Sequence, residues 1–461
     1  MTHIYLILLR DGTVVRTVEL MSAPTGSYPG AYPVTEPLPV LTARPTLRAT
    51  FASLSVPNFR WYTGALAASS AGGWLARIAT DWLMVELTGN VALISLVVAF
   101  QLLPPMLLAP WGGVVGDRFS ARRTVIAVQL LLVAAFLSLA IPAVLGAASV
   151  GLIILTSLLV GISAAFEGPS RAVFVVEVVG TRGLANAMGL NAAVQQCAGI
   201  VGAAVAGIAI AGLGAGWAMI IGAVGPVVGV IGLLLIRRDR LHPAIKVRAQ
   251  RGQIREAIHY VRRKNDIGAS LLLITVLALF GLTGSVLFGW AARDEFELGS
   301  AGYSLFQAMA ALGAFVGSLL AARRRRLRMR DNALLLAVSG AIWAVTGFAP
   351  TPALFIVAMV AALITRLMFM VANDSLTQLS TNGAIRARVV SLYMMCATGA
   401  QALGAVLTGW SVDALGGQTT FLITGLVPLA VAGSIAIAAT IGLRRQRGPR
   451  PPHAPRVLAA D

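Results

Sequence analysis

Residues 113–145 read GVVGDRFSARRTVIAVQLLLVAAFLSLAIPAVL, which places a charged segment directly before an apolar run. The run from Thr124 to Leu145 has no charged residue, and about 20 apolar residues in a helix are enough to cross the hydrocarbon core of a bilayer. A membrane-spanning strand would alternate apolar and polar residues, and this run does not. The stretch therefore predicts a transmembrane helix that begins at a basic loop.

The same pattern recurs along the whole chain of 461 residues. Hydrophobic residues make up 57% of the chain and charged residues only 12%, whereas a soluble domain has about 25% charged residues. We therefore expect an all-α membrane protein with twelve transmembrane helices in two pseudo-symmetric six-helix bundles. The predicted spans are 61–87, 91–115, 124–145, 149–170, 185–211 and 216–236, followed by 269–292, 301–322, 332–348, 353–374, 389–411 and 419–442.

Positive charge is concentrated in alternate loops, and on the other side the loop after residue 292 has Arg293 offset by Asp294, Glu295 and Glu297. The Lys and Arg residues gather in the segments 118–123, 171–182, 237–264, 323–330, 386–388 and 444–447, whereas the loops near 88, 146, 213, 350 and 414 contain none. Because cytoplasmic loops hold the excess of Lys and Arg, we expect a multi-pass protein of the cytoplasmic (inner) membrane with both termini cytoplasmic. The formal charge of +18 is thus explained by topology and contact with the lipid bilayer, and no nucleic-acid partner is expected.

Five segments are expected along the chain. A basic linker between the two bundles contains Ile254, Ile258 and Val261 at helical spacing, which predicts an amphipathic helix on the cytoplasmic interface. The N-terminal tail has no span, and it is either disordered or partly an extension that precedes a true start at Met21. The segments are a cytoplasmic tail at 1–50, the first bundle at 51–236, the linker at 237–267, the second bundle at 268–443 and a cytoplasmic tail at 444–461.

The two halves also form a sequence repeat. A shift of 202 residues places Gly202 on Gly404 and Gly207 on Gly409, so the fifth and eleventh predicted helices are equivalent. Parallel repeats related by an axis normal to the membrane are one known route to a central transport site.

Several function classes are excluded by what the sequence lacks. The two lysines, Lys246 and Lys264, stand in no G-x-x-x-x-G-K-[ST] motif, so ATP hydrolysis by a phosphate-binding loop is excluded. Cys197 and Cys396 fall inside predicted spans, where they are expected to pack as small apolar residues. With four histidines, no metal-ligand spacing and no nucleophile elbow, we expect no enzyme activity, no metal and no cofactor.

The segment Gly113-Val-Val-Gly116-Asp117-Arg118-Phe-Ser-Ala-Arg122-Arg123 resembles the G-x-x-x-D-R-x-x-x-R-R loop motif of the major facilitator superfamily. Other stretches resemble the branch that includes the enterobactin exporter and drug-efflux permeases, and the likeness covers roughly residues 51–440. These stretches are Asn58-Phe59-Arg60, Trp82-Leu83 through Leu87-Thr88-Gly89, Phe306-Gln307 and Arg386-Ala-Arg388-Val389.

The resemblance implies a gating loop made of Gly113, Asp117, Arg118, Arg122 and Arg123, which latches the halves in the outward-facing state. Asp117 would then engage the start of helix 11 near Arg388, or Arg171 at the end of helix 4. The alternative is that Arg122 and Arg123 only fix topology.

Two departures from the family pattern matter. Ala321 stands where the second half would need an acid, so the latch is one-sided. Many drug/proton antiporters carry a G-P-x-x-G-G pattern on helix 5. The corresponding residues of this chain, Ala198-Gly199-Ile-Val-Gly202-Ala203, lack the proline, which weakens the case for antiport.

Ionisable residues inside spans are costly and each one suggests a function. Arg77 and Asp81 are four residues apart on helix 1 and are expected to pair, as are Glu167 and Arg171 on helix 4. The resemblance places helices 1, 4, 7 and 10 around the cavity, with Asp81 and Glu167 as the leading proton carriers. The alternative for each pair is a neutralised structural contact. The predicted proton and substrate pathway consists of Arg77, Asp81, Glu167, Arg171, Arg366 and Asp374.

These observations predict a monomeric secondary transporter that exports a small hydrophobic or amphipathic compound, such as a drug or a siderophore-like metabolite, by proton-coupled alternating access. Two alternatives stay open. One is a proton symporter or facilitator that imports a nutrient. The other is a non-transporting membrane scaffold or receptor, for which buried charge would have little use.

Overall fold

The computed structural model describes residues 52–118, 120–180, 183–242, 253–322 and 328–446. Within these ranges the side chains of 109–118, 185, 253–257, 265, 322, 383–384, 386–387, 439 and 441–446 lie outside the description. The predictions for the N-terminal tail, including a start at Met21, and for most of the C-terminal tail also fall outside it.

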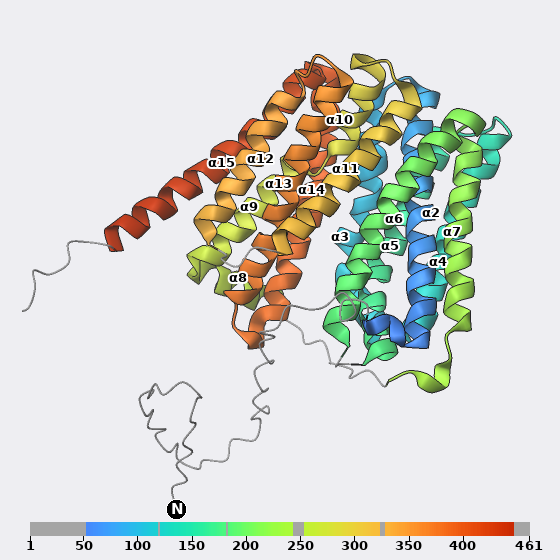
Figure 1. The fold of residues 1–461 in the computed structure, drawn as a ribbon, viewed down its shortest axis with the longest axis horizontal. Coiled ribbons are helices and arrows are strands. Elements are labelled where there is room, and N and C mark those ends of the chain that lie inside the picture. Colours follow the sequence, from blue (N-terminus) through green and yellow to red (C-terminus); the bar gives the residue numbers. More distant parts are fainter. Residues whose placement is uncertain (1–51, 119, 181–182, 243–252, 323–327, 447–461) are drawn as a thin grey trace, which may run out of the picture. The chain divides into compact units, whose positions relative to one another are not determined.

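The first half of the described chain consists of six long helices and three short 3₁₀ turns (Figure 1). The helices are α2 (Pro57–Thr88), α3 (Ile94–Arg118), α4 (Ala121–Val144), α5 (Val150–Val179), α6 (Leu184–Leu213) and α7 (Ala215–Leu235), and the turns are η1 (Ala52–Ser55), η2 (Val91–Leu93) and η3 (Arg238–Arg240).

The second half begins after the linker helix α8 (Gln253–Arg263). It consists of α9 (Asn265–Gly281), α10 (Gly284–Trp290), the π-helical turn η4 (Ala291–Glu295), α11 (Gly299–Ala322), α12 (Met329–Thr346), α13 (Pro352–Leu379), α14 (Gly383–Leu415) and α15 (Gly417–Gln446). Figure 1 shows the two halves as neighbouring groups of roughly parallel helices.

Each predicted span coincides with a helix or with a run of adjoining helices. Among the described residues, ten helices are long and apolar enough to cross a membrane. The two remaining long helices are α2, which contains Arg77, Asp81 and Glu86, and α12, which has 18 residues and begins at a charged segment. The all-helical membrane fold is confirmed, and the count of twelve crossings stays a prediction.

The internal repeat is visible in the helix caps. Ser149 accepts a hydrogen bond from the Leu152 amide to start α5, and 202 residues later Thr351 accepts one from the Leu354 amide to start α13. Gly214 and Gly416, again 202 residues apart, end α6 and α14 with φ of 84° and 80°. Only glycine adopts such angles without strain, so the two halves repeat both helix starts and helix ends.

The seventh predicted span, 269–292, is not a single helix. The α-helix ends at Gly281 and begins again at Gly284, and a π-helical turn follows at Ala291. Side chains from α13 and α14 bind the backbone at this break. Hydropathy averages over a window and therefore predicts one continuous span here.

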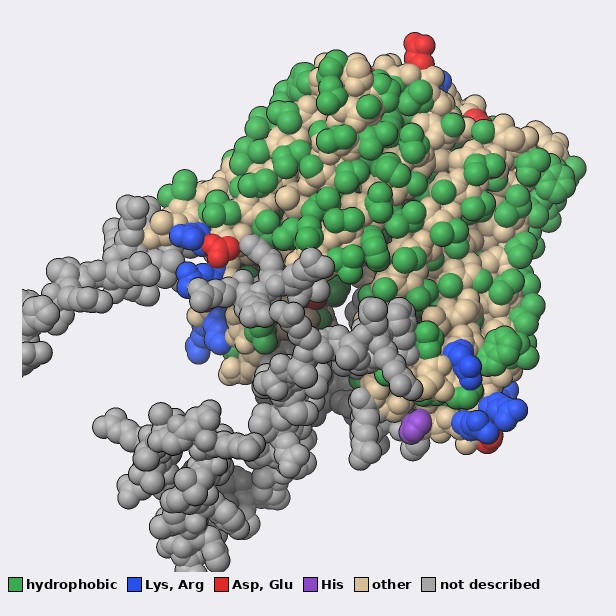
Figure 2. All heavy atoms as spheres, viewed as in Figure 1, with side chains coloured by type: hydrophobic (Ala, Val, Ile, Leu, Met, Phe, Trp, Pro, Cys, Tyr) green, Lys and Arg blue, Asp and Glu red, His purple; other side chains and the backbone are tan. Residues whose placement is uncertain are grey.

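The linker helix α8 packs against the second half. The Asn382 amide donates to the Tyr260 hydroxyl at 3.2 Å, and the Lys264 ammonium donates to the Ser380 carbonyl at 3.0 Å. In Figure 2 apolar side chains cover the flanks of the helices, and the Lys and Arg side chains gather at the end nearest α8. We call this the basic end of the molecule and the opposite one the far end.

Candidate transport pathway

A cavity of about 430 Å³ lies within the first half. Its walls come from α2, α4, α5 and α6, and they combine apolar side chains with polar and charged ones. The apolar lining includes Leu66, Trp74, Phe136 and Met188, and the polar lining includes Ser69, Ser70, Arg77, Glu167, Arg171, Asn191 and Gln195. Four of the six predicted pathway residues lie in this half, and three of them line the cavity.

Glu167 is the centre of a polar network that links three helices. Its Oε1 accepts from Arg171 Nε at 2.8 Å, so the predicted pair on α5 is present. The same oxygen accepts from Gln129 Nε2 of α4 at 3.0 Å, and Gln129 in turn accepts from the Ser69 hydroxyl of α2 at 2.7 Å. The network fixes the carboxylate at the cavity wall.

The expected pair between Arg77 and Asp81 is wrong. Both side chains are described, and the ion pairs formed among the described residues do not include one between them. Helix side chains point toward the N-terminus, so Arg77 leans away from Asp81, whereas Arg171 reaches back to Glu167. Arg77 instead lies over the Trp74 ring, 5.5 Å from its centroid, at the cavity wall.

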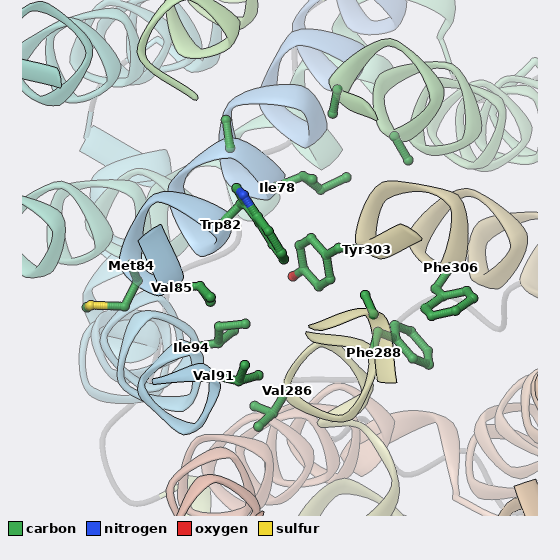
Figure 3. Packing of buried hydrophobic residues seen from close by; sticks show 14 of the residues in the cluster. Ile78, Trp82, Met84, Val85, Val91, Ile94, Val286, Phe288, Tyr303 and Phe306 are labelled. Carbon is green, nitrogen blue, oxygen red and sulfur yellow. The ribbon is translucent and has the colours of Figure 1, made fainter. Parts of the chain in front are cut away.

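Asp81 is tied to the other half of the molecule. It is only 2% exposed, and its Oδ2 accepts from the Tyr303 hydroxyl of α11 at 2.9 Å. Gln307 Nε2 donates to that hydroxyl at 3.0 Å, and Oδ1 of Asp81 has no partner. Figure 3 shows Tyr303 facing Trp82 of α2 in the apolar cluster, with the two rings stacked 5.9 Å apart.

The halves touch near the far end. There Asn90 Nδ2 donates to Asp413 Oδ1 at 3.2 Å. A Cβ added to Gly409 of α14 would lie 2.1 Å from Ser95 Oγ, so the backbone of α14 approaches α3 very closely. The hydrogen bonds from Asn90 to Asp413 and from Tyr303 to Asp81 both join the halves toward the far end. The structure is therefore closed between the halves at the far end.

Arg366 and Asp374 lie apart from the cavity, on α13. Arg366 is 4% exposed, lies 4.3 Å from the centroid of the Trp343 ring, and donates to the Gly281 carbonyl. Asp374 is half-buried and forms no ion pair with any described residue. Its neighbour Asn373 is fully buried and bonds Ser270, Asn332 and Tyr393.

The loop-motif residues divide into two groups. Gly113, Asp117 and Arg118 end α3 where side chains lie outside the described part of the chain. Arg122 is 6% exposed and donates to the carbonyls of Leu233 and Leu234, both at 3.0 Å, and Arg123 is exposed. Arg122 thus caps the C-terminus of α7 within its own half, where its charge complements the helix dipole.

Tyr303 and Gln129 were missed by the sequence predictions. Both are polar residues in apolar spans, and Tyr303 stands four residues before Gln307. Polar residues four apart on one helix face can be recognised in the sequence, but their spacing does not identify the residue that they bond on another helix. The link from Asp81 to Tyr303 therefore required the structure.

Comparison with known proteins bears on the whole helical region. Residues 48–447 match the family described as transmembrane secretion effector. The multidrug efflux pump Tap of Mycobacterium tuberculosis is 28% identical over 387 residues, which cover 80% of this chain and 90% of that protein. Macrolide efflux protein A of Streptococcus pyogenes is 22% identical over 367 residues, covering 78% and 90%.

Solved structures share the fold at low sequence identity. A bacterial homologue of the human lysosomal transporter Spinster, in an inward-facing and unoccupied conformation, superposes with a TM-score of 0.65 at 15% identity and covers 84% of this chain and 98% of its own. The nucleoside transporter NupG gives a TM-score of 0.66 at 15% identity, covering 83% and 99%. These matches establish the arrangement of helices.

Proposed function

Because the chain belongs to the transmembrane secretion effector family of the major facilitator superfamily, a family of transporters and not of enzymes, we propose that it exports small hydrophobic or amphipathic compounds by proton-coupled alternating access. The resemblance to this superfamily inferred from the loop motif is confirmed. Export of a drug or a siderophore-like metabolite is supported by the efflux proteins among its relatives.

The bond between Asp81 and Tyr303 is the observation on which the proposal depends. It joins α2 of one half to α11 of the other at the closed far end. An ionised carboxylate accepts a stronger hydrogen bond than a neutral one, so the protonation state of Asp81 changes the strength of this contact. Proton binding and the closure of the far end are thereby linked, which is what coupling requires.

The cavity in the first half supports a substrate site for amphipathic compounds. Its volume of about 430 Å³ falls within the usual range for small-molecule pockets. Trp74 and Phe136 offer apolar surface, while Asn191 and Gln195 offer hydrogen bonds. Glu167, held by Arg171, is the second candidate proton carrier.

Sidedness follows from charge. The basic end is assigned to the cytoplasm by the excess of Lys and Arg, so both termini are cytoplasmic and the far end faces outward across the inner membrane. The halves are closed at that far end, so a cytoplasmic substrate would reach the cavity from the basic end. We propose that the transporter works as a monomer.

The test is dye and drug uptake into energised inverted vesicles that contain the wild type, Asp81→Asn or Asp331→Asn. Asp81→Asn keeps an oxygen that accepts from Tyr303, but it cannot take up a proton, and the bond weakens from about 1.5–3 kcal/mol for a charged acceptor to about 0.5–1.5 kcal/mol for a neutral one. The variant is therefore expected to lower uptake by about tenfold or more. Asp331, which pairs with Arg330 at the start of α12, is the matched control and should leave uptake unchanged.

The outcomes separate the alternatives. Uptake that an uncoupler and Asp81→Asn both abolish supports proton-coupled export through Asp81. Uptake that survives Asp81→Asn but not the uncoupler would contradict Asp81 as the proton carrier and would assign that role to Glu167 or Asp374. Accumulation in right-side-out vesicles only would overturn export in favour of import, and no movement in either orientation would favour the scaffold.

A further inference from the structure

The cavity in the first half has an excess of positive charge. Three charged side chains of the described residues line it, and they are one acid, Glu167, and two cations, Arg77 and Arg171. The acid is already paired, because its Oε1 accepts from Arg171 Nε at 2.8 Å and from Gln129 Nε2 at 3.0 Å. The charge of Arg77 therefore has no partner on the cavity wall.

Arg77 differs from the other arginines held within the described helices. Arg122 and Arg366 donate to backbone carbonyls, and Arg171 donates to a carboxylate. Arg77 is half-buried, and it has neither a hydrogen bond nor an ion pair to any residue that the structure describes. Its nitrogen atoms are absent from the buried and unpaired atoms of that part of the chain, so they are open to the cavity.

The depth of Arg77 makes this unusual. It stands 16 residues into the predicted span 61–87, which is about 24 Å along a helix and past the middle of a hydrocarbon core of about 30 Å. A cation at such a depth is costly unless water or an anion compensates it. The five N–H donors of its guanidinium are therefore available to whatever enters the cavity.

Asp81 does not compensate Arg77. It follows four residues later on α2, but its Oδ2 accepts from the Tyr303 hydroxyl of the other half at 2.9 Å. It is neither part of the cavity lining nor within ion-pair distance of Arg77. Attraction across the longer distance supplies no hydrogen bond to the guanidinium.

The surroundings of Arg77 suit an apolar body with one charged end. The guanidinium lies over the Trp74 ring, and a Cβ added to Gly199 of α6 would lie 3.3 Å from Nε1 of that ring, so α6 packs directly on the ring. On the same helix Asn191 and Gln195, four residues apart, present their amides to the cavity. The remaining wall is mostly apolar and includes Leu66, Leu132, Phe136, Val160 and Met188.

We propose that Arg77 is the anion-recognition residue of this cavity and that the exported compounds are amphipathic anions. A carboxylate or sulfonate group would bind the guanidinium, which can donate two parallel hydrogen bonds to it, and the apolar body would lie against the aromatic wall. The inference rests on the export proposed above and specifies its substrate class. An amphipathic cation would meet two arginines and an acid that is already paired.

Binding of a matched pair of dyes tests the proposal without transport. Anilinonaphthalene sulfonate is an amphipathic anion, and phenylnaphthylamine is the same ring system without the sulfonate. Calorimetric titration of the protein in nanodiscs of zwitterionic lipid, with empty nanodiscs subtracted, gives both dissociation constants. The wild type is expected to bind the anionic dye about tenfold or more tightly than the neutral one, because hydrogen bonds to charged groups are the stronger ones.

Variants of the arginine assign the preference to its charge. Arg77→Gln is expected to weaken binding of the anionic dye by about tenfold or more and to change binding of the neutral dye by less than about twofold. Arg77→Lys, which keeps a cation, is expected to retain a preference for the anion. Arg60→Gln removes the same charge from an exposed site on α2 outside the cavity and should change neither constant.

Several outcomes would overturn the assignment. Equal affinities of the two dyes in the wild type, or equal losses in Arg77→Gln, would show that Arg77 has only a structural role. Tighter binding of ethidium, an amphipathic cation, than of the anionic dye would assign the cavity to cations. If Arg77→Gln does not fold, the dye preference of the wild type and of Arg77→Lys still decides.

An anionic lipid headgroup carries the same chemistry as a small anion, and the lipid composition separates the two. A difference between wild type and Arg77→Gln that disappears when the nanodiscs contain phosphatidylglycerol would show that a headgroup fills the site, and it would overturn the small-molecule assignment. The proposed export fails separately: a wild type that prefers the anion but does not accumulate it in inverted vesicles would overturn export alone.

Discussion

The first and seventh predicted spans occupy equivalent places in the two halves, yet they differ in construction. The first, α2, is continuous over 32 residues and packs against α7 so closely that a Cβ on Gly72 would lie 2.3 Å from the Gly222 carbonyl. The seventh is divided into α9 and α10 and is held by polar side chains from its neighbours.

The two places also differ in which helix supplies their charged side chains. Arg77 and Asp81 lie on α2 itself, whereas the arginine at the break, Arg366, comes from α13. A rigid helix can place a carboxylate precisely against Tyr303, while a divided helix can change shape. The comparison shows that the two halves share helix caps, although equivalent helices differ in continuity and in where their charged side chains come from.

The largest expected effect breaks the close contact of α2. Gly72→Leu should destabilise the protein by about 3 kcal/mol or more, at the upper end for overpacked cores, because backbone atoms of α7 leave no room for a side chain. Gly64→Leu, at a site on the same helix with open space around it, should change stability by less than about 0.5 kcal/mol.

Thermal unfolding in detergent measures both variants. Equal melting temperatures for Gly72→Leu and Gly64→Leu would show that the close approach of α7 to Gly72 does not limit the size of the side chain there.

An intermediate effect is expected from Tyr303→Phe, which removes the bond between α2 and the second half. A hydrogen bond to a charged group is worth about 1.5–3 kcal/mol, so closure of the far end should weaken by about tenfold or more. The rate of disulfide formation between Asn90→Cys and Asp413→Cys, whose native side chains touch, reports this closure.

Tyr62→Phe is the control for this variant, since Tyr62 bonds Asn191 within the first half. Disulfide formation that is equally fast in both variants would contradict the importance of the link between Asp81 and Tyr303.

The smallest effect concerns the break. Thr283→Val removes one hydroxyl from the pair with Thr408 and should destabilise the protein by about 1 kcal/mol. Thr275→Val, in α9 and away from the break, removes a bond to the Leu271 carbonyl of its own helix and a weak one with the Cys396 thiol, and should cost less than about 0.5 kcal/mol. Chemical unfolding of the two variants compares them, and a larger loss from Thr275→Val would argue that the break adds nothing to stability.

Much of the candidate site could be predicted because its signals are local. The pair of Glu167 and Arg171 follows from spacing on one helix, with the acid first. The pair of Arg77 and Asp81 has the same spacing in reverse order and does not form. Arg366 was predicted as a buried charge, but nothing in its neighbours along the chain points to Gly281, 85 residues earlier.

The sequence alone determined the helical membrane fold, the basic end and the repeat, because hydropathy, loop charge and cap residues act within one segment or between equivalent segments. The tertiary structure decided the partner of Asp81, the cap formed by Arg122 and the break in the seventh helix. These depend on which side chains meet between helices far apart in the chain, and a helix face specifies what it can bond without specifying its neighbour.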